Sequence, residues 1–121
     1  MNKKITILHT ESSKGWGGQE IRILQEAIGM RERGYRILIA TERDGILYQK
    51  ASNEGFEVFP IHFSKYNPNS FIKIKFLIEK EKVDIVNTHS SKDSWVATIA
   101  AKLAKNNPKI IRTRHLSTPI S

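Results

Sequence analysis

The sequence of 121 residues contains no cysteine, and this absence excludes disulfide bonds and thiolate metal sites. It also lacks any apolar run near the ~18 residues that a membrane-spanning helix needs. The apolar stretch behind Lys3 and Lys4 ends at His9, so it is too short for the core of a secretory signal. These absences fit a cytoplasmic protein, and a length of 121 residues suits a single domain.

Two phosphate-binding motifs are also absent from the glycine-rich loop at residues 10–18. A dinucleotide fingerprint needs a third glycine where Glu20 stands, and a P-loop needs Gly-Lys followed by Ser or Thr. Gly15, Gly17 and Gly18 nevertheless stand just before a predicted helix, where free N–H groups and the helix dipole favour an anion. The sequence therefore allows two interpretations of the loop: it binds an anion, or its glycines only allow the backbone to turn.

Strand and helix patterns alternate along the whole chain. Short β-branched or aromatic runs predict strands, and apolar positions three or four apart predict the helices between them. This alternation implies right-handed βαβ units and a parallel sheet. We predict a Rossmann-like, doubly wound α/β fold with five strands in the order 3-2-1-4-5. The predicted strands cover residues 3–9, 35–41, 56–63, 83–89 and 109–114. The predicted helices cover residues 19–33, 46–53 and 70–82, with a fourth after Ser91 that ends at Asn106.

The ends of these elements carry their own signals. Ser70 and Ser91 are predicted N-caps, because a serine side chain accepts hydrogen bonds from the first free N–H groups of a helix. Gly34 is predicted to end the first helix. The last strand is followed only by residues 115–121, without a helix to cover it. Since a doubly wound sheet has helices on both faces, we expect a truncated domain.

Histidines and arginines occur where open α/β sheets bind ligands, beyond the carboxyl ends of the central strands. His9, His89 and His115 end the first, fourth and fifth predicted strands. Arg112 and Arg114 alternate along the fifth strand and so share one face. Each histidine could instead have a purely structural role, and the two arginines could instead lie on a solvent-exposed surface without a ligand. No close ligand spacing such as His-Glu-x-x-His occurs, so no metal site is predicted.

The net charge of +8 predicts attraction to anions. Nucleic acid, anionic lipid and phosphorylated small molecules are the candidate partners. Nucleic acid is disfavoured, because no reading motif occurs and the aromatic residues fall mostly at core-like positions instead of among the basic ones.

Three segments, in order, resemble family 4 glycosyltransferases of the GT-B fold. Residues 16–20 (Trp-Gly-Gly-Gln-Glu), with a helix ending in residues 31–37 (Arg-Glu-Arg-Gly-Tyr-Arg-Ile), are similar to that family's opening, although Tyr35 replaces the usual histidine. Residues 84–92 (Asp-Ile-Val-Asn-Thr-His-Ser-Ser-Lys) resemble its "D-I-V-H-x-H-x-x-K" segment, and residues 112–117 resemble its "T-x-H" strand end. The resemblance runs through essentially the whole chain.

The resemblance implies that residues 1–121 form the N-terminal, acceptor-side domain of a two-domain enzyme. Such an enzyme moves a sugar from a nucleotide-diphosphate sugar to an acceptor with retention, and no further cofactor is expected. By resemblance, Gly17 and Gly18 reach the donor phosphates. His115 lies beside the transferred sugar as the catalytic residue, and His89 and Arg114 bind substrate in the same cleft. Lipid-linked and surface-polysaccharide acceptors are common in the family, and the positive charge fits a peripheral position at the inner face of an anionic membrane.

The family's C-terminal, donor-binding domain has no counterpart in the sequence. Its Glu-x7-Glu motif is missing, since no glutamate is followed by another eight positions later. Electrostatic stabilisation of the departing diphosphate is usually the largest catalytic contribution, so the chain is expected to be inactive alone. The alternative hypothesis is a non-catalytic α/β binding module, or remnant, that docks on a partner or on an anionic membrane.

Overall fold

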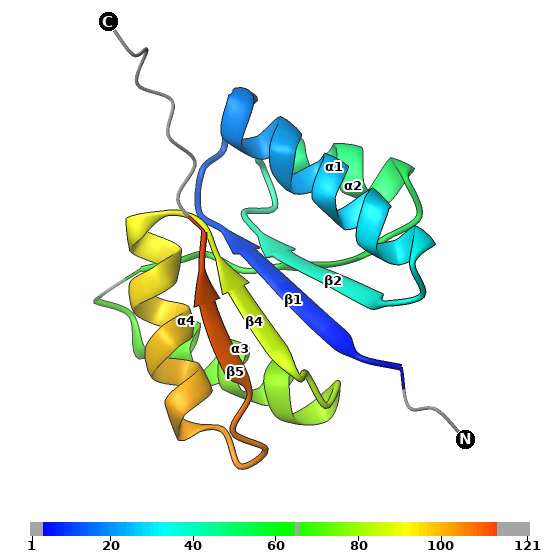
Figure 1. Ribbon diagram of the computed structural model, residues 1–121. Coiled ribbons are helices and arrows are strands. Elements are labelled where there is room, and N and C mark those ends of the chain that lie inside the picture. The colour runs from blue at the N-terminus through cyan, green and yellow to red at the C-terminus, as the bar shows by residue number, and fades with distance from the viewer. Residues whose placement is uncertain (1–3, 65, 114–121) are drawn as a thin grey trace, which may run out of the picture.

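The computed structural model of the protein describes residues 4–64 and 66–113. Strands and helices alternate along this part of the chain, as Figure 1 shows. The strands are β1 (Thr6–Glu11), β2 (Arg36–Thr41), β3 (Glu57–Pro60), β4 (Ile85–Thr88) and β5 (Lys109–Arg112). The helices are α1 (Gly18–Glu32), α2 (Ile46–Asn53), α3 (Pro68–Lys80) and α4 (Ser91–Leu103).

The five strands form one parallel sheet in the order β3-β2-β1-β4-β5, which confirms the predicted fold class and strand order. The chain begins at β1 in the centre, builds outward through β2 to β3, and then crosses to β4 on the other side of β1. The direction of winding therefore reverses between β1 and β4. In an open α/β sheet this switch point, beyond the carboxyl ends of the strands, is where ligands bind.

Helices cover both faces of the sheet, and each face has its own apolar core. On one side, Ile7, Ile37 and Ile39 of the sheet pack against buried residues of α1 and α2. On the other side, Leu8 and Val86 pack against a larger cluster from α3 and α4. The alternation of neighbours such as Ile7 and Leu8 follows from the two-residue period of a strand. The sheet is thus the middle layer of three, as Figure 1 shows.

The strands differ from the predicted ranges mainly at their ends. β1 continues beyond His9 to Glu11, because Thr10 and Glu11 stay in register with Ala40 and Thr41 of β2. Polar residues were expected to begin the loop, but here they extend the strand. This correction places a carboxylate at the end of the central strand.

Two helix caps also lie one to three residues before the predicted ones. Asn67 caps α3, its side chain accepting a hydrogen bond from the Asn69 N–H, and Pro68 occupies the first turn. Ser70 is instead buried and donates to the carbonyl of His62. Ser90 caps α4 in place of Ser91. Gly34 ends α1 as predicted, with a φ of 98° that favours glycine.

One part of the sheet face beside α1 is not covered by the described helices. Ile7, Ile85 and Ile111 line a hollow there together with Met30 of α1. Ile111 on the outer strand β5 is accordingly 43% exposed. Residues 115–121, from which the truncated domain was predicted, lie outside the described residues, so the truncation stays a prediction.

Candidate functional site

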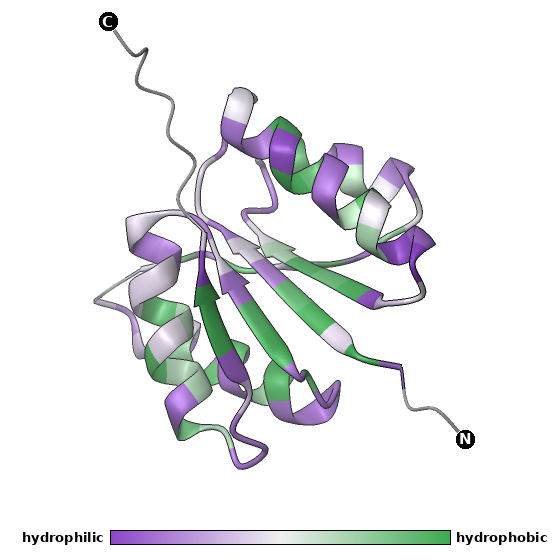
Figure 2. Cartoon of the chain, viewed as in Figure 1, coloured by the Kyte–Doolittle hydropathy of each residue, from purple (hydrophilic) through white to green (hydrophobic). Residues whose placement is uncertain are grey.

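The carboxyl ends of β1 and β4 are polar, whereas the strands are apolar along most of their length (Figure 2). Thr10, Glu11, Thr88 and His89 at these ends are all buried. Buried polar groups must be hydrogen-bonded to offset the loss of water. The partners that they find define a connected polar network at the switch point of the sheet.

Glu11 is the centre of this network. Its carboxylate is 1% exposed and accepts hydrogen bonds from the Ser13 N–H (2.9 Å), the Gln19 side-chain amide and the Ser90 hydroxyl. The Gln19 amide also donates to the Ser90 oxygen at 2.8 Å. These donors come from the loop after β1, from the start of α1 and from the β4–α4 turn. Glu11 therefore joins the two segments that flank the switch point.

Asp93 forms a second centre one turn into α4. Its carboxylate accepts hydrogen bonds from the Thr10 hydroxyl (2.6 Å), the Ser90 N–H (2.8 Å) and the His89 N–H (3.1 Å). Burial raises the pKa of Asp93 to about 6, opposed by the hydrogen bond from Thr10 and reinforced by the negative charge of Glu11. The side chain thus fixes the backbone of the β4–α4 turn against β1.

The raised pKa of Asp93 predicts a specific pH dependence of stability. The folded state holds the carboxyl proton of Asp93 more tightly than the unfolded state, in which the pKa is near 3.8. The contribution of Asp93 to stability therefore falls as the pH rises from about 4 to about 6. The free energy of unfolding of the native chain, minus that of Asp93→Asn, should decrease by about 2–3 kcal/mol over this rise in pH. Urea titrations at several pH values measure this difference. The exposed Asp44, whose pKa Lys14 lowers, is the matched control, because the difference for Asp44→Asn should stay nearly constant between pH 4 and pH 6 and change in the opposite sense only below about pH 4. A constant difference for Asp93→Asn would contradict the assignment.

The glycine-rich loop spans residues 12–17 in the structure, because β1 extends to Glu11 and α1 begins at Gly18, and it is anchored at several points. Besides the Ser13 contact, the carbonyl of Lys14 accepts the Ile46 N–H at 3.1 Å, and the Lys14 ammonium lies 3.0 Å from Asp44. Trp16 packs on the core beneath α1 and α2, with the Lys50 ammonium 5.0 Å from its ring centroid. The loop is therefore tied to three different elements, which is the preorganisation that a binding loop requires.

Gly17 and Gly18 differ in what surrounds them. Gly17 is the N-cap of α1, and its N–H donates to the Glu20 carboxylate at 2.6 Å. Gly18 is the first helical residue, and a Cβ there would meet nothing within 4 Å. The first N–H groups of a helix have no partner inside the helix. Gly18 consequently offers open space beside a helix N-terminus, whereas the Gly17 N–H is already occupied.

Gly45, which precedes α2, has a packing role that the sequence did not reveal. A Cβ at this position would lie 3.2 Å from both the Glu42 carbonyl and the Lys14 Cα, so the α2 turn approaches the glycine-rich loop at backbone distance. We expect Gly45→Ala to lower the free energy of unfolding by about 1–2 kcal/mol. Gly18→Ala is the matched control and should be neutral or slightly stabilising, because alanine favours a helix. Thermal melts of the two variants compare these effects, and equal destabilisation would refute the close approach at Gly45.

His89 is buried directly after β4, and it is 5% exposed. Its Nε2 lies 3.0 Å from Nδ1 of His9, and the two rings are stacked with centroids 5.2 Å apart. The two histidines predicted at neighbouring strand ends thus lie together at the switch point. His9 also lines the hollow beside α1. Substrate binding by His89 stays a prediction.

Two of the predicted site residues, Arg114 and His115, lie outside the described residues. Arg112, the last residue of β5, is exposed, and its guanidinium lies 3.5 Å from the Ser91 hydroxyl. Thr113 continues the polar edge, donating to the Asn87 side chain at 2.8 Å. The end of β5 therefore adjoins the β4–α4 region that holds His89.

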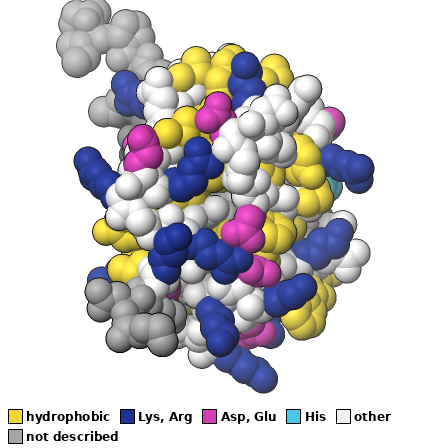
Figure 3. Space-filling view, turned by 90° about the vertical axis from the view of Figure 1, so that its right-hand side faces the viewer, with side chains coloured by type: hydrophobic (Ala, Val, Ile, Leu, Met, Phe, Trp, Pro, Cys, Tyr) yellow, Lys and Arg dark blue, Asp and Glu magenta, His cyan; other side chains and the backbone are white. Residues whose placement is uncertain are grey.

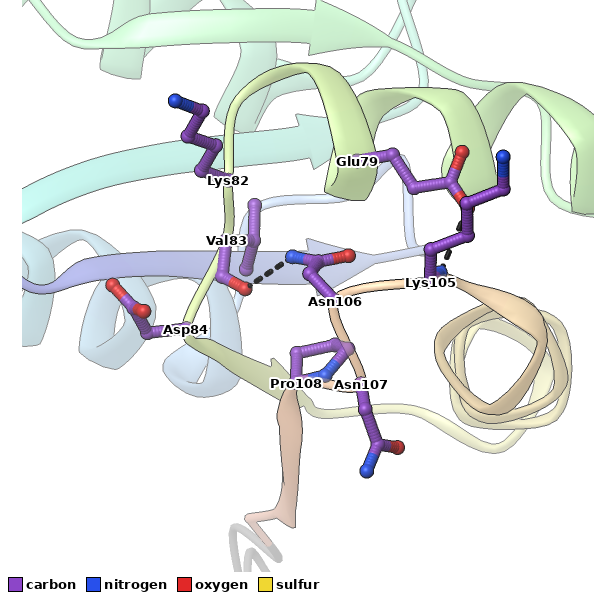
Figure 4. A pocket seen from close by; sticks show the side chains of 8 residues that line it. All are labelled: Glu79, Lys82, Val83, Asp84, Lys105, Asn106, Asn107 and Pro108. Atoms are coloured by element: carbon purple, nitrogen blue, oxygen red, sulfur yellow. Dashed lines mark hydrogen bonds between the residues drawn. The ribbon is translucent and has the colours of Figure 1, made fainter.

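Another hollow lies at the opposite edge of the sheet, between the turns that precede β4 and β5 (Figure 4). Its polar groups hold these turns in place. The Glu79 carboxylate accepts the Lys105 N–H at 2.8 Å, the Asn106 amide donates to the Val83 carbonyl at 3.0 Å, and the Asp84 carboxylate accepts the Thr6 N–H at 2.9 Å. The polar groups of this hollow therefore stabilise the fold, and the hollow lies at the sheet edge opposite the hydrogen-bond network of Glu11.

The basic side chains on one face of the molecule do not form a single cluster. Figure 3 shows one face of the molecule, where Lys and Arg side chains are spread among hydrophobic and acidic ones. No described helix is both long enough and apolar enough to cross a lipid bilayer.

Sequence reasoning missed Glu11, Gln19 and Asp93 as parts of the site. One signal was readable: Ser90 and Asp93 form a capping box, in which a serine is followed three residues later by an acidic side chain. Glu11 had no such signal, because its role depends in part on a donor, Ser90, that lies 79 residues away in the sequence.

The arrangement defines the class of the protein: a Rossmann-like domain of the kind that forms one half of GT-B glycosyltransferases. The family model of Glycosyltransferase Family 4 matches residues 16–120, and the chain belongs to this family. A solved glycosyltransferase from Rickettsia africae ESF-5 is similar to 99% of the chain, with 26% identity and a TM-score of 0.78. MurG of Acinetobacter baumannii (13% identity, TM-score 0.74) and HepE of Anabaena in complex with UDP-glucose (17% identity, TM-score 0.71) share the fold over 93% and 89% of the chain.

The chain spans about a third of the length of these solved proteins. The match covers 32% of the Rickettsia protein, 35% of MurG and 28% of HepE. Among curated proteins, none matches the chain significantly.

Proposed function

We propose that this chain is the acceptor-side domain of an enzyme that transfers a sugar from a nucleotide-diphosphate sugar to an acceptor. The observation that carries the proposal is the family match over residues 16–120, which includes the end of the glycine-rich loop and the β4–α4 turn. HepE, which shares the fold, was crystallised with UDP-glucose, and this supports a nucleotide sugar as the donor. Lipid-linked or surface-polysaccharide precursors are the acceptors we propose, with the protein on the cytoplasmic side of the membrane.

The site residues have distinct proposed roles. The open space at Gly18, beside the N-terminus of α1, is suited to the close approach of a donor phosphate. Gly17 shapes the same helix start, with its N–H held by Glu20. His115 is the proposed catalytic residue beside the transferred sugar, and Arg114 and His89 are proposed to bind substrate at neighbouring strand ends.

A chimera tests this proposal. The chain replaces the first third of the Rickettsia glycosyltransferase, which it matches over 99% of its own length. Release of UDP from UDP-glucose and other UDP-hexoses is then measured. We expect turnover by the chimera and none by the 121-residue chain alone, because the diphosphate needs stabilising groups from the second domain.

Two controls make the result decisive. The truncated Rickettsia protein without its first third gives the background, and circular dichroism reports whether the chimera is folded. The alternative function, a non-catalytic binding module, would be favoured by one result: a folded chimera that binds UDP but forms UDP from the UDP-sugar no faster than this background.

A further inference from the structure

A further hollow lies between helix α4 and the last strand of the sheet. β5 is the outermost strand on that side, and α4 packs next to it (Figure 1). We call this hollow the α4 groove. The side chains that give it its chemistry are Ser91, Trp95, Thr98 and Lys102 of α4 and Arg112 of β5. The four from α4 are spaced four, three and four residues apart, so they share one face of the helix.

Trp95 is the largest apolar group of the α4 groove. Its side chain is 52% exposed, although tryptophan is on average among the more buried residues of folded proteins. It belongs to neither of the two apolar cores on the faces of the sheet. An exposed indole offers a large, rigid contact surface at a small entropic cost, which is why tryptophan is enriched where proteins bind partners. Core packing therefore does not account for Trp95, whereas a bound ligand would.

The α4 groove carries a positive charge at each of its ends. At one end the Arg112 guanidinium lies 3.5 Å from the Ser91 hydroxyl. At the other end Lys102 lies two helical turns, or ~10 Å, beyond Trp95. None of the described residues that line the groove is acidic. The one acidic residue of α4 and β5, Asp93, is fully buried against β1 on the inner side of the helix. The groove therefore favours an anionic ligand.

One aromatic surface and several hydroxyl groups between two cations suit an acidic saccharide. A sugar ring has an apolar face of C–H groups, which can stack on an indole, and a rim of hydroxyl groups, which exchange hydrogen bonds with serine and threonine. A carboxylate or phosphate on the same sugar would accept hydrogen bonds from Arg112 or Lys102. A nucleic-acid strand is bound by successive stacked aromatic residues, whereas Trp95 is the one aromatic residue among the described residues that line the groove.

We propose that the α4 groove binds an acidic saccharide of the acceptor, that is, a sugar that carries a carboxylate or a phosphate. The end of the groove at Ser91 and Arg112 adjoins the β4–α4 turn, which follows His89 at the switch point of the sheet. An acceptor whose reacting end lies at the switch point can therefore continue along α4 past Trp95. This proposal rests on the proposed function, because it names the chemistry of the acceptor in that reaction.

Calorimetric titration of the 121-residue chain tests the proposal. The probes are two acidic saccharides, trigalacturonate with carboxylates and trehalose 6-phosphate with a phosphate, and the neutral cellotriose. We expect at least one acidic probe to bind at low ionic strength, and the one that binds identifies the recognised group. Cellotriose should bind much more weakly. Trp95→Ala should raise the dissociation constant about tenfold, because the stacking surface is lost. Arg112→Gln should raise it about tenfold as well, because a charge-assisted hydrogen bond is lost. Trp95→Tyr should retain most of the affinity.

The matched control is Phe76→Ala on α3. Phe76 is also an exposed aromatic residue beside a cation, with the Lys75 ammonium 5.6 Å from its ring centroid, but it lies outside the α4 groove. Its loss should leave binding unchanged. Thermal melts of all variants show whether each one is folded.

Several results would overturn the proposal. These are binding of neither acidic probe, equal binding of cellotriose, or the same loss of affinity in Phe76→Ala as in Trp95→Ala. Tighter binding of a short oligothymidylate that depends on Trp95 would assign the groove to nucleic acid instead. Loss of a dimer in Trp95→Ala, measured by sedimentation velocity, would assign it to a second copy of the chain. The titration uses neither the donor nor the second domain, so failure of this proposal and failure of the proposed sugar transfer are distinguishable.

Discussion

Replacing Glu11 by alanine is expected to lower the free energy of unfolding by about 4 kcal/mol. The carboxylate is almost fully buried and accepts hydrogen bonds from Ser13, Gln19 and Ser90. Alanine would leave these donors without their acceptor in a site that water does not reach easily. Since the donors belong to the glycine-rich loop, α1 and the β4–α4 turn, the loss should also loosen all three segments.

Urea denaturation measures the stability change, and hydrogen exchange of residues 12–19 measures the loosening. Glu32→Ala is the matched control, because Glu32 is an exposed residue at the end of α1 and its loss should change stability by less than about 0.5 kcal/mol. If Glu11→Ala unfolds at the same urea concentration as Glu32→Ala, then Glu11 does not hold the site together.

The second large effect is expected at Gly18, in the chimera with the Rickettsia protein. Gly18→Val should lower kcat/KM for the donor sugar about 100-fold, because the side chain would keep the donor phosphate away from the backbone N–H, and one such donor to a developing negative charge contributes about that much. A Cβ at Gly18 meets nothing within 4 Å, so the valine side chain would extend from an open position into the space proposed for the ligand. The loss should therefore appear in activity and leave the melting temperature nearly unchanged.

Gly18→Ala and Gly29→Ala serve as graded controls. Alanine at Gly18 should lower activity less than valine, because the side chain is smaller. A Cβ at Gly29 in the middle of α1 also meets nothing within 4 Å, and it is remote from the helix start, so that variant should keep full activity. Unchanged kinetics for Gly18→Val would remove Gly18 from the donor site.

Much of the fold could be predicted because each local pattern agrees with the global one. The two-residue period of β1 and β2 and the three-to-four-residue period of α3 reflect which side chains face the sheet core. The strand order followed from the alternation of strands and helices, which implies right-handed βαβ units in a doubly wound sheet. Element ends were less predictable: α3 begins at Pro68 because Asn67 competes successfully with Ser70 as the cap.

The candidate site was only partly predictable, for a physical reason. His9 and His89 could be placed at neighbouring strand ends, but their contact at 3.0 Å depends on the register of β1 against β4. Glu11 and Asp93 carry no motif that involves both of them, and each acquires its role from hydrogen bonds to segments about 80 residues away, such as the 2.6 Å bond between Thr10 and Asp93. Residues such as Glu11 and Asp93, which hold other segments of the site in place, can therefore be recognised only from the folded structure.

The measurement that tests the central claim most directly is hydrogen exchange of the chimera with and without the UDP-sugar that it turns over. We predict slower exchange in residues 12–20, at the carboxyl edge of the sheet beside Gly18. Residues 79–84 and 105–108, which border the hollow at the opposite edge, should exchange at unchanged rates. Protection of that opposite edge, with no change in the glycine-rich loop, would contradict the account.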